Sequence, residues 1–304
     1  MEAAAAIVNL TRPLGLEFEM LCPVTEAKSR HEFQVALARI LTANGFPAVA
    51  RSYSTLPLPR GIFAAVEFDE SLVPPDAFDG INWANLEVKT TKLAGLAEYD
   101  RYVPRLLDIC KFLNCGVNES TGLHVNLGVT DELAHPEFLR SFLNLVWRFE
   151  PVLFGLVHRS RLTCGYAYPM PDQRELWSRR LHQETRRRLQ GLWSKNYGIN
   201  LQHVFSLGQQ GRERIEFRQH EGTLDAVEVR HWVVLLNRLI DHAATHACKI
   251  PKARTLNDRS GLEKLFITCG MKPNNRLYKH VSPELVATRR FLLKRWRRLS
   301  GWKS

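Results

Sequence analysis

The stretch RIEFRQHEGTLD at residues 214–225 constrains the fold of this chain more than any other segment. Its first half alternates in character, because the apolar residues Ile215 and Phe217 alternate with the charged residues Glu216 and Arg218. Successive side chains of a β-strand point to opposite faces of the sheet. The pattern therefore predicts a strand with an apolar back and a front that carries a carboxylate beside a guanidinium.

A turn and a helix are predicted directly after this strand. Gly222 permits a sharp turn, because it lacks the side chain that restricts other residues. Either Thr223 or Asp225 can cap the helix that follows, since both side chains accept hydrogen bonds from main-chain amides. We expect that helix to cover residues 224–248.

Two other stretches share this design. The sequence GLEFEM places Glu17 and Glu19 on one face, and GLHVNLG places His124 and Asn126 on one face, each with apolar side chains behind. An antiparallel sheet commonly has one solvated face, which is one interpretation of the pattern. Carboxylates, histidine and arginine also hold divalent cations and phosphates, which is the functional interpretation. The pattern alone leaves both open.

Composition limits the class of protein. The 304 residues suffice for one large domain or two small ones. A net charge of +11 favours an anionic partner. The six cysteines form no Cys-x-x-Cys pair, which favours a reducing compartment. The sequence shows neither a signal peptide nor an apolar run of membrane-spanning length, so we expect a cytoplasmic protein.

The order of the predicted elements indicates an α+β fold with a mostly antiparallel sheet. Strands are expected at 14–20, 46–53, 62–68, 84–89 and 122–128, and residues 196–205 lead into a strand that pairs with the Glu216 strand across a turn at 208–211. Helices are expected at 29–44, 96–114, 136–157, 173–193, 224–248, 257–269 and 283–300. Composition shifts after Pro251, which divides the chain into a main domain over 1–250 and a basic helical extension over 251–304, packed on or near the core.

The ordered set of these segments resembles the amidoligase family, a branch of the carboxylate–amine ligase superfamily with glutamine synthetase and glutamate–cysteine ligase. The segments that carry the resemblance are Gly15-x-Glu17-x-Glu19, Gly122-Leu-His124-Val-Asn126, Asn200-Leu and Glu216-Phe-Arg218-Gln-His-Glu-Gly-Thr-Leu-Asp, spread over residues 14–248. The resemblance implies a sheet curled into a funnel with helices on its outer face. It also implies a reaction in which ATP phosphorylates a carboxylate and an amine then attacks the acyl phosphate to form an amide.

The resemblance further implies roles for individual residues and a need for ATP and Mg²⁺, with Mn²⁺ as an alternative metal. Catalytic roles fall to Arg218, Glu216 and His124, and metal binding to Glu17, Glu19, Glu87 and Glu216. Nucleotide binding falls to Arg218, Asn126 and Asn200, and substrate binding to Arg161, Lys89 and His220. The implied partners are a carboxylate substrate and an amine substrate, the latter an amino acid, a peptide or a protein.

Two departures from the family pattern bear on these roles. Asn126 stands where the family often has a second histidine, and an amide is a poorer metal ligand. The family's Glu-x-x-Ser-Pro strand end reads here as Glu87-Val-Lys89-Thr90-Thr91. Lys89 shares the face of Glu87 and could neutralise it or bind substrate. These departures keep open the alternative of a pseudoenzyme that binds a ligand without turnover.

A protein that binds nucleic acid or another anionic partner is a further alternative. The segment 289–298 is a basic amphipathic helix of the kind that contacts acidic partners. Binding of nucleic acid would be strongly salt-dependent. It gives no reason for Glu17, Glu19, Glu87 and Glu216, because carboxylates repel phosphate unless a cation lies between them. The ligase is therefore the preferred hypothesis.

Overall fold

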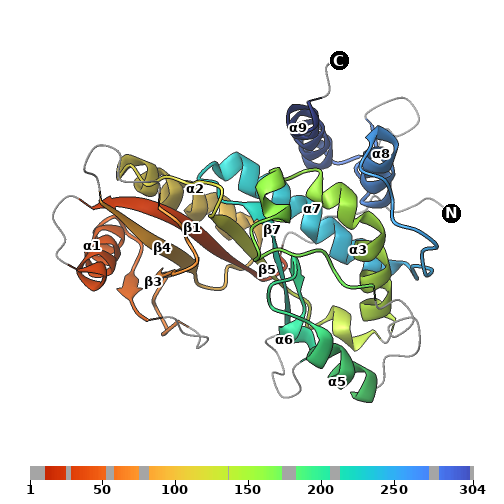
Figure 1. Cartoon of the computed structure of the whole chain (residues 1–304), viewed down its shortest axis with the longest axis horizontal. Helices are drawn as coiled ribbons and strands as arrows, with labels where there is room; N and C mark the ends of the chain where they lie inside the picture. The colour runs from red at the N-terminus through yellow and green to blue at the C-terminus, as the bar shows by residue number, and fades with distance from the viewer. Residues whose placement is uncertain are drawn as a thin grey trace. The chain divides into compact units, whose positions relative to one another are not determined.

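The structure is a computed structural model that describes residues 11–24, 29–52, 58–74, 82–135, 137–172, 183–205, 213–273 and 281–301. Helices and strands combine in an α+β fold, and seven strands form one mostly antiparallel sheet of order β2-β3-β4-β1-β5-β7-β6 (Figure 1). The chain divides into two compact units, the first comprising Thr11–Asn126 and His220–Val229 and the second including Leu127–Gln219 and Arg230–Ser304. Strands β5 (Gly122–Gly128) and β7 (Arg214–Glu221) contribute residues to both units.

The first unit contains the longest strands, β1 (Leu14–Val24) and β4 (Asn82–Thr90). They pair antiparallel, and β3 (Ala64–Phe68) pairs antiparallel with the other side of β4. The predicted pair at 46–53 and 62–68 also forms, but β2 (Ala48–Ala50) runs parallel to β3 and is only three residues long.

Helix α1 (Arg30–Ala43) covers β2 and β3 in the first unit (Figure 1). It begins after Ser29, whose side chain accepts a hydrogen bond from the amide of Glu32, and it is followed by Gly45 with a φ of 88°. Leu37 and Leu41 on one face are buried. Helix α2 (Leu96–Phe112) buries an apolar face that includes Tyr99, Val103, Leu106 and Leu107. Both helices agree with the sequence-based prediction.

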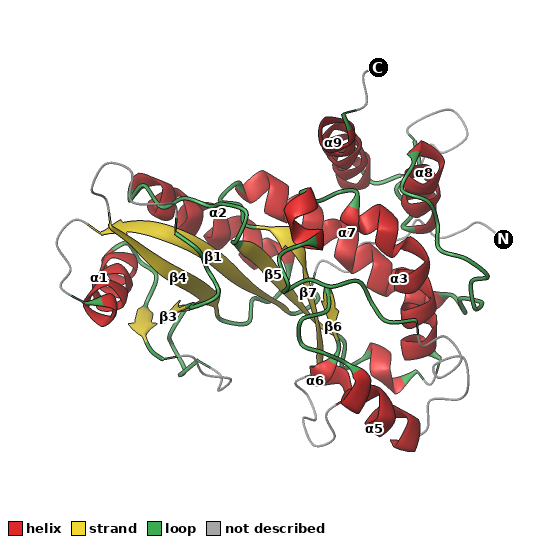
Figure 2. Ribbon diagram, viewed as in Figure 1, coloured by secondary structure: helices red, strands yellow, loops and turns green. Residues whose placement is uncertain are grey.

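Helices make up most of the second unit (Figure 2). Its core is built on α3 (Phe138–Phe154) and on α7 (Ala226–Thr245), which supplies residues from Arg230 onward. The phenyl rings of Phe142 and Phe217 meet edge to face at 6.2 Å, so the predicted apolar back of β7 packs on α3. The predicted helix at 173–193 is described over α5 (Gln183–Leu192), and residues 173–182 lie outside the described residues.

One predicted strand is shorter than expected. Within 196–205 only β6 (Ile199–Asn200) pairs with β7, and α6 (Gln202–Phe205) is helical. The side chain of Asn200 accepts a hydrogen bond from the amide of Gln202, and such a contact starts a helical turn rather than continuing a strand. The expected turn at 208–211 lies outside the described residues.

The C-terminal helices α8 (Arg259–Thr268) and α9 (Pro283–Ser300) pack within the second unit. Trp296 is buried, and the Arg295 guanidinium donates to the carbonyl of Leu156. Arg289 forms an ion pair with Glu263 of α8. Helix α9 therefore buries apolar surface as well as presenting basic residues. Across the described ranges, no helix combines the length and the apolar character that a bilayer crossing requires.

Candidate active site

The first unit gathers charged side chains from neighbouring strands on one face of the sheet. Glu17 and Glu19 come from β1, Glu87 from β4 and His124 from β5. In the β1–β4 register Glu19 lies opposite Glu87. Directly opposite residues of an antiparallel pair share a face, so the pairing brings carboxylates together that are about 70 residues apart in the sequence.

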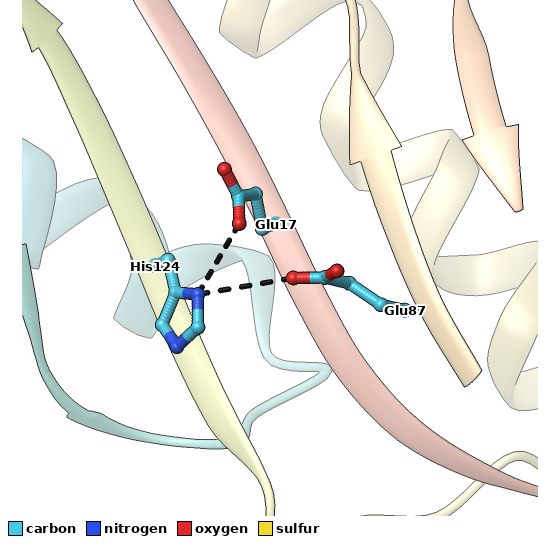
Figure 3. A group of neighbouring side chains, drawn as sticks. All are labelled: Glu17, Glu87 and His124. Atoms are coloured by element: carbon cyan, nitrogen blue, oxygen red, sulfur yellow. Dashed lines mark hydrogen bonds and ion pairs between the residues drawn. The ribbon is translucent and has the colours of Figure 1, made fainter. Parts of the chain in front are cut away.

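His124 lies among three of these carboxylates. Its Nδ1 is 3.3 Å from Oε2 of Glu17 and 3.8 Å from Oε1 of Glu87, as Figure 3 shows. Its Nε2 is 3.1 Å from Oε1 of Glu19. Asn126, the next front-facing residue of β5, donates from Nδ2 to Oε1 of Glu17 at 2.9 Å. Five sequence-predicted residues, Glu17, Glu19, Glu87, His124 and Asn126, thus form one connected group.

The charged face is not solvated, contrary to the simpler interpretation of the sequence. The side chains of His124 and Glu87 are only 3% and 6% exposed, and that of Glu17 is 20% exposed. Burial of charges is costly unless each charge has a partner, so this enclosed cluster favours the functional interpretation.

Burial and mutual repulsion separate the pKa values of two carboxylates in the cluster. Burial raises the pKa of Glu87 well above its usual range, and the negative charge of Glu17 raises it further. Burial would also raise the pKa of Glu17, but the hydrogen bond and positive charge of His124, together with Lys89, outweigh burial and lower that pKa. Two carboxylates that repel each other in this way are suited to a shared cation.

Glu67 is a carboxylate at this face that was not predicted from the sequence. Glu67 of β3 lies opposite Glu87, is fully buried, and pairs with Arg51 Nε at 2.7 Å and with Lys89 Nζ at 2.9 Å. Lys89, predicted to bind substrate, also pairs with Glu87 at 2.8 Å. Glu67 is the single charged residue in the apolar run FAAVEF, and that exception was a signal in the sequence.

The donor atoms of the cluster fit a divalent cation. One ligand atom each from Glu17, Glu87 and His124 lies within 4.8 Å of the others, and the same holds for Glu19, Asp69 and Glu87. Carboxylate oxygens are the ligands preferred by Mg²⁺, and the additional imidazole nitrogen suits Mn²⁺ as well. Because the carboxylates come from paired strands, the donors are held by a rigid part of the fold.

In the second unit, further predicted residues lie on β7 or contact it: Glu216, Arg218, Asn200 and Arg161. Glu216 accepts hydrogen bonds from Asn200 Nδ2 and from Arg218 Nη1, both at 2.7 Å, and Asn200 lies opposite Glu216 in the β6–β7 register. Arg218 Nε also donates to the carbonyl of Tyr166. Arg161, predicted to bind substrate, is buried and donates to the main-chain carbonyl of Arg218, so it positions the strand.

His220 and the turn after β7 form a further polar group in the first unit. His220 is buried, with Nδ1 2.7 Å from the carbonyl of Glu221 and Nε2 3.5 Å from a carboxylate oxygen of Glu228. Gly222 has no positive φ, unlike the glycines at six other described positions. A Cβ built on Gly222 would lie 2.1 Å from Oγ1 of Thr121, so close packing, and not the sharp backbone turn we expected, requires glycine there.

Comparison with known proteins assigns the chain to a family. The family model described as "Putative amidoligase enzyme" matches residues 11–240. No curated protein matches the chain. Among solved structures, the crystal structure of the complex between the prokaryotic ubiquitin-like protein Pup and its ligase PafA is similar at 13% identity and a TM-score of 0.40, covering 97% of this chain. The chain spans 65% of the length of that matched chain. Since the family model covers more than half of the residues, this chain belongs to the amidoligase family.

Proposed function

We propose that this protein is an ATP- and Mg²⁺-dependent carboxylate–amine ligase that forms an amide bond through an acyl phosphate. The observation that carries the proposal is the convergence of Glu17, Glu87 and His124, whose ligand atoms lie within 4.8 Å of one another in a nearly buried cluster. Membership of the amidoligase family supports the same reaction class.

The reaction has two steps in this proposal. A substrate carboxylate oxygen attacks the γ-phosphorus of ATP, and ADP leaves. The amine of the second substrate then attacks the acyl carbon, loses a proton, and displaces phosphate. Phosphoryl transfer of this kind asks the protein mainly for positioning and for positive charge near the transferred group.

The carboxylate cluster is proposed to hold the metal that accompanies ATP. Glu17 and Glu87 would bind Mg²⁺ directly, with Glu19 as a further ligand and His124 orienting the carboxylates through its two nitrogens. These residues would hold the metal, which would supply positive charge against the phosphates of ATP. Asn126, which donates to Glu17, would hold that carboxylate in place.

Arg218 is proposed to bind the transferred phosphoryl group. Its guanidinium is oriented by Glu216 and by the carbonyl of Tyr166, which fixes the plane of the donor fork. Asn200 holds the other oxygen of Glu216 and so keeps that carboxylate in position. Glu216 as a metal ligand, Asn200 at the nucleotide, and His220 and Arg161 at the substrate stay predictions, as do the funnel-shaped sheet and the cytoplasmic location.

Calorimetry with ATP tests the proposal directly. Binding of ATP should require Mg²⁺, and Glu87→Gln should weaken it at least tenfold, because a cation site loses a charged ligand. Glu70→Gln is the matched control, since Glu70 is an exposed acid outside the cluster. Nucleotide binding that is independent of the metal, or equal in Glu87→Gln and Glu70→Gln, would refute the assignment. ADP release with mixtures of amino acids and peptides would then separate a ligase from a pseudoenzyme.

A further inference from the structure

Three carboxylates form a row across three adjacent strands of the first unit. Glu67 of β3 lies opposite Glu87 of β4, and Glu87 lies opposite Glu19 of β1. Like charges directly opposite each other on neighbouring strands destabilise the pairing. All three residues are buried, which reduces screening by water and strengthens the repulsion. The row therefore requires positive charge within it.

Lys89 supplies a positive charge at one end of this row. Its Nζ lies 2.9 Å from Oε2 of Glu67 and 2.8 Å from Oε2 of Glu87, so the ammonium bridges the two carboxylates. The Lys89 side chain is 14% exposed, and those of Glu67 and Glu87 are 0% and 6% exposed. Lys89 follows Glu87 by two residues on the same strand, so alternation along β4 places both on this face. An ammonium between two carboxylates stands where a divalent ion would bind two oxygen ligands.

We propose that Lys89 is a resident cation of the site and replaces one divalent ion. In this arrangement Lys89 neutralises the Glu67–Glu87 end of the row, and metal binding is confined to the side away from Glu67, where Glu17, Glu19 and His124 lie around Glu87. The identity of the metal rests on the proposed function. The role of Lys89 adds the number of divalent ions that the site binds. This arrangement also gives Lys89 a role within the protein, as a positioning residue for the carboxylates, in place of substrate contact.

Formal charges support this division of the row. Glu17, Glu19, Glu67 and Glu87 carry four negative charges, and Lys89 together with Arg51, which pairs with Glu67 at 2.7 Å, carries two positive charges. The two negative charges that remain, together with that of Asp69 beside Glu19 and Glu87, are balanced by His124 and one divalent ion. Replacing Lys89 by a neutral residue removes the ammonium that neutralises the buried Glu67–Glu87 pair. A second divalent ion would then bind in the space that the ammonium leaves, with these two carboxylates as its ligands.

Direct measurement of Mn²⁺ binding tests the inference without any enzymatic assay. Free Mn²⁺ is measured by electron paramagnetic resonance during titration of the full chain, with Mg²⁺ as competitor. Lys89→Gln should bind one Mn²⁺ more per chain than the unmodified protein. Lys89→Arg keeps the charge and should bind the same number as the unmodified protein. Lys92→Gln makes the matched change at an exposed lysine three residues away and should also leave the number unchanged.

Thermal melts keep the test decisive if Lys89→Gln is unstable. In EDTA the variant should melt at a lower temperature than Lys92→Gln, and saturating Mn²⁺ should remove most of that difference. Equal ion numbers in Lys89→Gln and the unmodified protein, or a Lys89→Gln variant that Mn²⁺ does not stabilise, would overturn the inference. An unmodified chain that binds no Mn²⁺ would instead refute the proposed function, whereas one additional ion in Lys89→Gln would still support the role of Lys89.

Discussion

Arg218 and Glu216 lie two residues apart on the same face of β7 and form an ion pair with 2.7 Å between Nη1 and Oε1. The other oxygen of Glu216 accepts from Asn200, so the carboxylate is held on both sides. The alternating residues Ile215 and Phe217 are fully buried on the opposite face of the strand. Truncating Glu216 or Arg218 on one face of β7 therefore leaves no cavity in the core, whereas truncating Ile215 or Phe217 on the other face does.

Replacement of Arg218 by alanine should abolish amide formation, lowering the rate roughly a hundredfold or more through loss of charge stabilisation. The fold should persist with a loss of about 1–3 kcal/mol, because Glu216 loses one partner while no core cavity opens. Lysine should restore little activity, since it lacks the planar fork. ADP release and thermal melts measure both effects.

Phe217→Ala is the matched control on the opposite face of the same strand. It should destabilise the fold by about 3–5 kcal/mol, because it removes a fully buried ring that packs edge to face on Phe142. Its activity per folded molecule should be close to that of the unmodified protein. Near-full turnover by Arg218→Ala, or equal destabilisation of the two variants, would contradict the catalytic role proposed for Arg218.

Gly222→Ala should destabilise the protein by more than 1 kcal/mol, because its new methyl group would meet the side chain and backbone of buried Thr121. Gly191→Ala, in helix α5, meets nothing within 4 Å and should stabilise the protein by about 0.5–1 kcal/mol. Urea denaturation compares the two. If both substitutions stabilise, the close contact at Gly222 does not exist in solution.

Stability should fall as pH rises from about 4.5 to about 7, because of Glu150. Burial raises the pKa of Glu150 to about 7, although the amide of Met170 and the guanidinium of Arg254 oppose the shift. The folded state keeps a proton that the unfolded chain releases above pH 4.5, so this contribution is complete below that pH and is lost by about pH 7. At 1.36 kcal/mol per pKa unit the loss amounts to about 3 kcal/mol.

Glu150→Gln isolates this effect, since glutamine keeps the shape and does not titrate. Urea denaturation between pH 4 and pH 8 should show the variant gaining stability relative to the unmodified protein as pH rises. Parallel stability profiles for the two proteins would show that Glu150 is already ionised in the fold at low pH.

Gln219→Met should stabilise the protein by about 1–2 kcal/mol. Gln219 is fully buried, and within the described part of the chain neither of its side-chain polar atoms has a hydrogen-bond partner. Gln34→Met is the control, because Gln34 is also buried but donates to the carbonyl of Arg51, and its replacement should bring no gain. Calorimetric melting temperatures of the two variants decide the matter. A less stable Gln219→Met would indicate that the amide is satisfied in solution.

Much of the fold followed from periodicity in the sequence. The alternation in GLEFEM and GLHVNLG predicted both strands and the shared front of Glu17, Glu19 and His124, because alternation along a strand is a local property. The helices were predicted for the same reason. Residues 196–205 were expected to lead into a strand that pairs with β7; β6 does pair with it, but the side chain of Asn200 starts a helical turn directly after that pair of residues.

Features that depend on contacts between distant segments were not predictable. The burial of the charged face, the bridge of Lys89 to Glu67, and the approach of Thr121 to Gly222 all depend on strand order and register. Glu67 was visible as an isolated charge in an apolar run, yet only the pairing of β3 with β4 places it opposite Glu87. A single sequence carries no direct record of such pairings.

The order of strands in the sheet predicts which strands lose their backbone hydrogen bonds first and how readily the sheet edges pair with another chain. The sheet ends in β2 with three residues and in β6 with two, whereas β1 and β4 have hydrogen-bonded neighbours on both sides. Each edge therefore offers an approaching chain very few backbone groups for intermolecular pairing. In hydrogen–deuterium exchange, amides of β2 and β6 should exchange early and those of β1 and β4 late. Local unfolding of the edge strands therefore leaves the strands that carry Glu17 and Glu87 intact.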